Sequence, residues 1–249
     1  MKESENWEES LSSQKRGVER SLEKKCRRAI YEFSLLNQEK EIAVALSGGK
    51  DSITLLLLLH FLAGKGFPNW KIHALHVGGA YSCGANLSLP LLRRICEKRE
   101  ICLTICPSQT ERETNCYSCS RKRRRLLFEK MRQLGVETIA FGHHADDAIQ
   151  TTVMNLFHKG EFATHLPKIH MRQYGVTIIR PLIYIREEEI VSFAQKHGFL
   201  RRTCQCPIGA RSMRKRVKDL LEIVKGEFPH THGNLLKASL LYGSQKSAL

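Results

Sequence analysis

The sequence predicts a doubly wound α/β fold with a mostly parallel sheet, and three observations support this prediction. Residues 42–46 form a continuous apolar run before a glycine turn, which is typical of a strand buried on both faces. Further short apolar runs follow along the chain. These runs alternate with segments of helical apolar spacing, an order that favours a parallel sheet with helices on both faces. Ligands of such sheets bind at the carboxyl ends of the strands.

The same patterns give the order of the expected elements. Strands are expected at residues 42–46, 71–77, 101–105, 138–141 and 177–179. Helices are expected at residues 21–37, 52–63, 87–99, 118–134, 146–157, 187–197 and 213–224. Residues 165–173 are expected to loop over an edge of the core. Residues 1–20 are expected to form a flexible N-terminal tail, and residues 21–249 one domain with a C-terminal helical part.

Positive charge is concentrated in two segments of a chain whose formal net charge is +15. Residues 111–132 hold eight basic and three acidic side chains, and residues 196–218 hold eight basic side chains and no acidic one. Clustered cations attract a polyanion and release its counterions. The clusters therefore favour nucleic-acid binding over the alternative of a merely solvated surface, because both lie beside cysteine motifs.

Cysteine usage and the N-terminus predict a cytoplasmic location. The first twenty residues lack the apolar core of a signal peptide, and the longest apolar run is too short for a membrane span. Structural disulfides are not expected among nine cysteines in a reducing compartment. Cys26, Cys96 and Cys102 lie in or beside apolar-periodic segments and are expected in the core, whereas others could bind metal or react.

A glycine turn joins the first strand to the next helix. Its residues are Ser47, Gly48, Gly49, Lys50, Asp51 and Ser52. The glycines let the backbone approach an anion, and the N–H groups of the helix start point toward phosphate oxygens. Lys50 adds a positive charge, and Asp51 could hold Mg²⁺ or cap the helix. The turn predicts a phosphate site, against the alternative of an ordinary strand–helix turn.

A second polar motif ends the fourth strand at the same edge of the sheet. Residues 142–147 read Gly-His-His-Ala-Asp-Asp. Asp146 and Asp147 could bind Mg²⁺ or orient a nucleotide, and the histidines could act on protons or phosphate. The alternative, that Asp146 caps the next helix and His143 packs in the core, does not account for all four side chains.

Two cysteine motifs flank the basic segments. Cys116 and Cys119 form a C-x-x-C at the start of a helix, a spacing that suits one metal ion or cluster. Cys204 and Cys206 form a later C-x-C. The first motif alone leaves a metal site, a redox pair and coincidence open, and the second does not choose between zinc and iron–sulfur.

Residues 47–52 match the SGGxDS signature of the PP-loop ATP pyrophosphatases. The ordered combination of motifs resembles one branch of that family, the tRNA 2-thiocytidine synthetases (TtcA-like). The resemblance extends over about residues 22–240 and rests on residues 47–52, 116–125, 142–147 and 180–184. It implies a Rossmann-like fold of the adenine nucleotide alpha hydrolase type. It also implies ATP-dependent tRNA thiolation, in which a cytidine of the anticodon loop is adenylated and its 2-oxygen is replaced by sulfur carried on an iron–sulfur cluster.

The resemblance assigns roles to particular residues. The catalytic residues would be Lys50, Asp51 and Asp146. The residues that bind ATP, with Mg²⁺, would be Ser47, Gly48, Gly49, Lys50, Asp51, Ser52, His76, Gly142, His143 and Asp147. The RNA-binding residues would be Arg121, Lys122, Arg123, Arg124, Arg125, Arg214 and Arg216. The implied partners are tRNA and a sulfur donor such as a cysteine desulfurase; no membrane is implied, and a homodimer is allowed.

A [4Fe-4S] cluster would be held by Cys116, Cys119 and one downstream cysteine. The family shows C-x-x-C downstream where this chain has C-x-C, and the spacing favours Cys206, with Cys204 as its rival. The alternatives are another tRNA-modifying enzyme of the same family, of the thiouridine or lysidine type, or a zinc-containing RNA-binding module. The cluster hypothesis requires the cysteines to converge on one pocket beside residues 47–52.

Overall fold

The computed structural model describes residues 17–79, 85–108, 116–200 and 213–244. Its centre is a six-stranded sheet of order β3-β2-β1-β4-β6-β5. The strands are β1 (Glu41–Ala45), β2 (Lys71–Gly79), β3 (Cys102–Ser108), β4 (Thr138–Ala140), β5 (Lys168–Met171) and β6 (Val176–Ile179). All neighbours pair in parallel except β5, which is antiparallel to β6. The predicted mostly parallel α/β sheet is confirmed.

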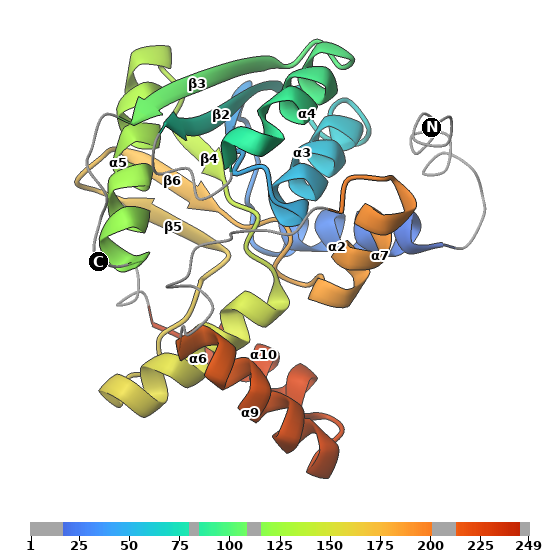
Figure 1. The fold of residues 1–249 in the computed structure, drawn as a ribbon, viewed down its shortest axis with the longest axis vertical. Helices are drawn as coiled ribbons and strands as arrows, with labels where there is room; N and C mark the ends of the chain where they lie inside the picture. Colours follow the sequence, from blue (N-terminus) through green and yellow to red (C-terminus); the bar gives the residue numbers. More distant parts are fainter. Residues whose placement is uncertain (1–16, 80–84, 109–115, 201–212, 245–249) are drawn as a thin grey trace.

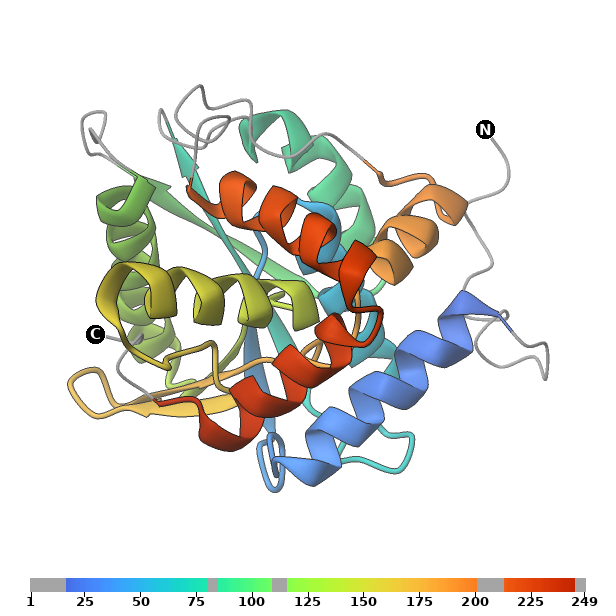
Figure 2. The same ribbon diagram turned by 90° about the horizontal axis from the view of Figure 1, so that it is seen from below.

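Helices cover both faces of this sheet. They are α2 (Val18–Glu32), α3 (Lys50–Leu62), α4 (Ala85–Glu97), α5 (Cys116–Leu134), α6 (Ala145–Lys159), α7 (Glu187–Lys196), α9 (Met213–Glu227) and α10 (Thr231–Tyr242). Helices α2, α3, α4 and α7 share one apolar core, and α5 packs on the opposite face (Figure 1). Helices α6, α9 and α10 contact one another beyond the carboxyl ends of the strands (Figure 2). Within the described ranges, no helix is both long and apolar enough to cross a bilayer.

After the exposed Glu41, strand β1 is apolar because both of its faces are covered. Ile42 and Val44 belong to the core beneath α2 and α3, whereas Ala43 belongs to the core beneath α5. All three side chains have no exposed surface. The glycine turn follows β1 directly in the chain. It therefore lies at the carboxyl edge of the sheet, where α6, α9 and α10 contact one another.

The structure differs from the sequence predictions at several points. Residues 168–171, expected to be part of a loop, form the edge strand β5, which a turn at Gly175 (φ 62°) joins to β6. Helix α10 was not expected, although its Leu236 and Leu240 pack against the core. Helix α2 begins at Val18, before the expected start at residue 21. Cys26 and Cys96 are buried as expected, but Cys102 is exposed because it begins the edge strand β3.

Candidate active site

The glycine turn has the geometry of an anion cradle. Gly48 has a φ of 87°, a left-handed conformation that favours glycine, and Gly49 precedes the first residue of α3. The Ser47 and Ser52 hydroxyl oxygens lie 3.1 Å apart, and the Gly49 N–H donates to Ser47 Oγ at 3.3 Å. The N-terminus of α3 therefore opens at the carboxyl edge of the sheet, where its N–H groups favour a phosphate.

Two neighbouring strands hold this turn in place. His76 on β2 has no exposed surface, and its Nδ1 lies 2.7 Å from the carbonyl oxygen of Leu46. The structure thus places His76 behind the turn. Gly142 lies against the turn from the other side, since a Cβ built there would stand 3.0 Å from both Asp51 C and Ser52 N. Only glycine lets the segment between β4 and α6 approach the turn so closely.

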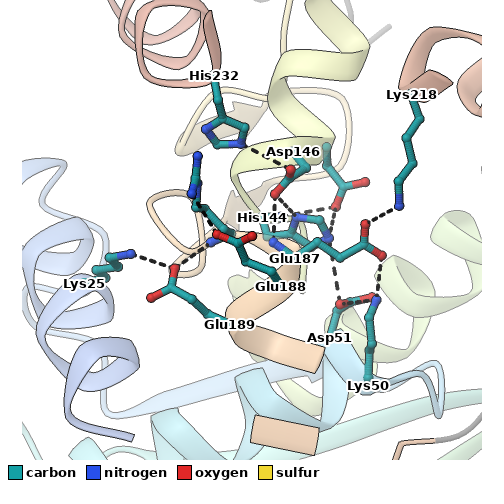
Figure 3. Close-up of polar contacts among 12 residues, drawn as sticks. Lys25, Lys50, Asp51, His144, Asp146, Glu187, Glu188, Glu189, Lys218 and His232 are labelled. Atoms are coloured by element: carbon teal, nitrogen blue, oxygen red, sulfur yellow. Dashed lines mark hydrogen bonds and ion pairs between the residues drawn. The ribbon is translucent and has the colours of Figure 1, made fainter. Parts of the chain in front are cut away.

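Lys50 lies at the centre of a buried ion-pair network, shown in Figure 3. It is 8% exposed, and its Nζ lies 2.9 Å from Asp51 Oδ1 and 3.1 Å from Glu187 Oε1. Burial opposes its charge, but Asp51 and Glu187 outweigh that effect and raise the pKa of Lys50. The other Glu187 oxygen lies 2.8 Å from Lys218 Nζ of α9. Lys50 is therefore a fixed cation at the predicted phosphate site.

His144 stands between three carboxylates. Its Nε2 lies 3.8 Å from Asp51 Oδ1 and 3.4 Å from Asp147 Oδ2, and its Nδ1 lies 3.5 Å from Asp146 Oδ2 (Figure 3). Burial opposes the imidazolium, yet the carboxylates prevail and raise the pKa of His144. Asp51, Asp146 and Asp147 thus come together at one edge of the sheet, as the sequence predicted, each within 3.8 Å of His144.

Asp146 and Asp147 also contact helices that lie far along the chain. Asp146 accepts the Glu187 N–H at 2.7 Å, and its Oδ1 lies 3.1 Å from His232 Nε2 of α10. Burial favours the neutral acid, but these partners and His144 keep the pKa of Asp146 well below its usual range. Asp147 accepts the His144 N–H at 3.2 Å at the start of α6 and pairs with Arg214 of α9. The N-cap residue of α6 is therefore His144, and the carboxylate that bonds back to its N–H belongs to Asp147 at N3 and not to Asp146.

A stack of three rings leads away from this edge. The ring centroids of Phe141 and His143 are 5.7 Å apart, and those of His143 and His165 are 4.4 Å apart, each pair at 16°. Arg180, 4% exposed, donates from Nε to His143 Nδ1 at 3.2 Å and from Nη1 to the Leu166 carbonyl. Burial, strengthened by the neighbouring cation of Arg180, lowers the pKa of both histidines well below 6.5. His143 thus packs, as the alternative interpretation of the motif expected.

The cysteine motifs are only partly described. Helix α5 begins at Cys116, and Cys119 is partly exposed on its first turn. Cys204 and Cys206 lie outside the described residues, so the convergence of the cysteines stays a prediction. Among the residues that are described, no group of three or more His, Cys, Asp or Glu side chains could hold a metal ion.

The predicted RNA-binding residues lie on two helices that border the site. Arg121, Lys122 and Arg125 are exposed on α5, where Arg125 pairs with Glu129, and Arg123 and Arg124 are partly buried. Arg214 and Arg216 are exposed on α9.

Electrostatic effects tie both helices to the site. Burial is the largest cause of the lowered pKa of His76, and the charge of Arg123 lowers it further. For His165, burial is again the largest cause, and the charges of Arg124 on α5 and Arg214 on α9 add to it. Arg124 of α5 and Arg214 of α9 thus both act on His165, at the end of the ring stack.

Four functional candidates were not predicted from the sequence. Glu187, His232, Arg180 and His165 contribute through contacts with residues far along the chain, as Glu187 does with Lys50 across 137 positions. For two of them the sequence held a signal, which was the acidic start of α7 for Glu187 and the motif at residues 180–184 for Arg180.

Comparisons with known proteins point to one family. Residues 18–203 match the family model described as the PP-loop domain. A tRNA-cytidine(32) 2-sulfurtransferase of Geotalea uraniireducens is 33% identical over 219 residues, which cover 85% of this chain and 87% of that protein. The namesake enzyme of Syntrophotalea carbinolica is 32% identical over 227 residues, 88% of each chain.

A solved structure shares the fold. The U34-tRNA thiolase NcsA from Methanococcus maripaludis, solved with its [4Fe-4S] cluster, superposes with a TM-score of 0.71 at 21% identity. The superposition covers 89% of this chain and 78% of the thiolase. It supports the adenine nucleotide alpha hydrolase-like arrangement of the sheet and its carboxyl edge.

Proposed function

The chain belongs to the PP-loop family, and from its likeness to the tRNA-cytidine(32) 2-sulfurtransferases we propose that it is an ATP-dependent tRNA sulfurtransferase. Its substrate is a cytidine of the anticodon loop, whose 2-oxygen it replaces with sulfur. One observation carries the proposal: the buried Lys50 and the carboxylates of residues 142–147 meet at the glycine turn after β1.

The residues present fit ATP, whose phosphates would carry Mg²⁺ with the help of one or two carboxylates. The α3 N-terminus and Gly48 offer an anion cradle, and Lys50 supplies a cation beside it. Asp51, Asp146 and Asp147 supply carboxylate oxygens on the same edge, all within 3.8 Å of His144. These side chains are fixed by hydrogen bonds before any ligand arrives, and such preorganised charge stabilises a phosphoryl-type transition state.

The reaction has two displacement steps. The cytidine 2-oxygen attacks the α-phosphorus of ATP, and pyrophosphate leaves with the electron pair of the broken P–O bond. A sulfur nucleophile at the oxidation level of sulfide then attacks C2 and loses its proton, while the C2–O bond breaks and AMP leaves. In the first step, the N–H groups of the turn and Lys50 bind the phosphate oxygens and stabilise the charge that develops on them.

The first turn of α5 fits the role of a sulfur site. Cys116 and Cys119 would hold a [4Fe-4S] cluster together with Cys206, or with its rival Cys204, and the cluster would supply the position that carries the sulfur. The basic residues that follow on α5 and those on α9 would bind tRNA phosphates on either side. A sulfur donor such as a cysteine desulfurase, a cytoplasmic location and a homodimer remain predictions.

Nucleoside mass spectrometry of tRNA tests the proposal directly. Cells that lack the protein should lose 2-thiocytidine, wild-type protein should restore it, and Lys50→Ala should not. In vitro, pyrophosphate release from ATP should require tRNA. Loss of a thiouridine or of lysidine instead would contradict the cytidine assignment, and unchanged tRNA would contradict the function.

A further inference from the structure

The ring stack of Phe141, His143 and His165 is a built feature that the proposed chemistry does not use. Its rings come from the end of β4 and from the segment before β5, and both centroid steps keep the same 16° tilt. Phe141 and His143 flank Gly142, which touches the glycine turn. The stack therefore includes both chain neighbours of the glycine that lies against the phosphate turn, and it ends at His165.

Arg180 holds the two histidines in register. One guanidinium donates to His143 Nδ1 and to the carbonyl of Leu166, the neighbour of His165. Thr164, on the other side of His165, donates to the Ala148 carbonyl at 3.0 Å. The segment that carries His165 is thus fixed at two points, and His143 and His165 are both half-buried residues. A rigid ring with an exposed part loses little entropy when another ring stacks on it.

The surroundings of His165 suit a nucleotide. Burial lowers the pKa of His165, and the cations of Arg180, of Arg214 on α9 and of Arg124 on α5 lower it further, so the imidazole is neutral. Unpaired RNA bases are bound by stacking on aromatic side chains, while nearby cations contact the adjoining phosphates. Among the described residues, the ring contacts end at His165.

We propose that His165 is the stacking platform for the target base, an unpaired pyrimidine of the tRNA. This inference rests on the proposed function and adds to it the residue that recognises the extruded base. The base lies over the exposed part of His165, one stack away from Gly142 and the phosphate turn.

Two substitutions test whether His165 acts through its aromatic ring or only through the volume of its side chain. His165→Phe keeps an aromatic face, whereas His165→Leu keeps an apolar side chain of similar size without one. The Leu variant should lower kcat/KM for tRNA by roughly tenfold or more, with the KM for ATP unchanged, and Phe should restore most of it. His158→Ala, on the exposed end of α6, is the matched surface control and should behave as wild type.

A binding assay separates this inference from the proposed function. The probe is an anticodon stem-loop RNA with the fluorescent base pyrrolocytidine at the target position. Wild type and the Phe variant should quench its fluorescence, and the Leu variant should bind the RNA without quenching. If the Leu variant does not fold, His165→Gln carries the same expectation.

Two results overturn the platform. One is equal quenching and equal kcat/KM in the wild type and Leu variants, and the other is an equal loss in the Leu and Phe variants. A wild-type protein that quenches the base yet forms no 2-thiocytidine would keep the platform and refute the proposed function.

Discussion

The contact between Gly142 and the phosphate turn can be tested with a single methyl group. In Gly142→Ala the new Cβ would lie 3.0 Å from Asp51 C, 3.0 Å from Ser52 N and 3.1 Å from the Asp51 carbonyl oxygen. All three are backbone atoms, so the turn must move by a few tenths of an ångström. Overpacking of this kind costs about 1–3 kcal/mol of folding free energy.

The larger effect should fall on ATP. A misplacement of about 1 Å at a reacting group can cost on the order of a hundredfold in rate, so a shift of this size should lower kcat/KM for ATP by roughly three- to tenfold. Pyrophosphate release at varied ATP concentration measures this ratio, and urea denaturation measures the stability.

The control is Gly226→Ala on α9, where an added Cβ meets nothing within 4 Å. This change should leave kcat/KM as it is and stabilise the helix by about 0.5–1 kcal/mol. Our reasoning is refuted if Gly142→Ala shows wild-type stability together with wild-type kcat/KM for ATP.

Three further predictions concern the other parts of the site. Cys119→Ala should lose most of the iron measured after anaerobic purification, whereas Cys102→Ala, at an exposed position, should keep it. Full iron content in both variants would exclude a cluster bound by Cys119. Carboxylates outweigh burial and raise the pKa of His144, so its contribution to stability is complete below pH of about 6.5 and disappears as pH rises through the raised value. His144→Asn should therefore lower the free energy of unfolding more at pH 6 than at pH 9, which urea denaturation checks, and an equal loss would contradict the assignment. Replacing the exposed Arg121 and Lys122 by Ala should weaken tRNA binding and reduce the slope of log K against log salt by roughly 0.7–0.9 per lost phosphate contact, measured by filter binding, and an unchanged slope would exclude phosphate contacts there.

The sequence predicted the features of the fold and site that are set by residues close together in the chain. An apolar strand, a glycine turn and a helix start are consecutive, so the position of Lys50 at the carboxyl edge followed from residues 42–52 alone. The meeting of Asp51 with Asp146 and Asp147 also followed, since parallel strands end at one edge. The edge strand β5 was missed because its four residues include only one fully buried apolar side chain, Ile169.

Contacts between distant segments were not predictable in the same way. His232 reaches Asp146 from 86 positions away, and Arg180 reaches His143 across 37 positions. Neither depends on a local period or on a spacing between neighbours, because each is set by how helices and loops pack in three dimensions. The sequence likewise gave no reason to single out His165, whose role depends on a ring contributed by another strand end.

The C-terminal helices contribute to the candidate active site because three of its carboxylates contact them. Glu187 pairs with Lys218 and Asp147 with Arg214, both on α9, and Asp146 lies 3.1 Å from His232 Nε2 of α10. Without the two cations of α9, the carboxylates beside the phosphate turn would repel one another and an incoming phosphate. Magnesium bound with ATP would neutralise the same oxygens, so metal and helices act on shared groups. The basic helix α9, which begins at Met213, thus reaches back along the chain to the aspartates that begin α6.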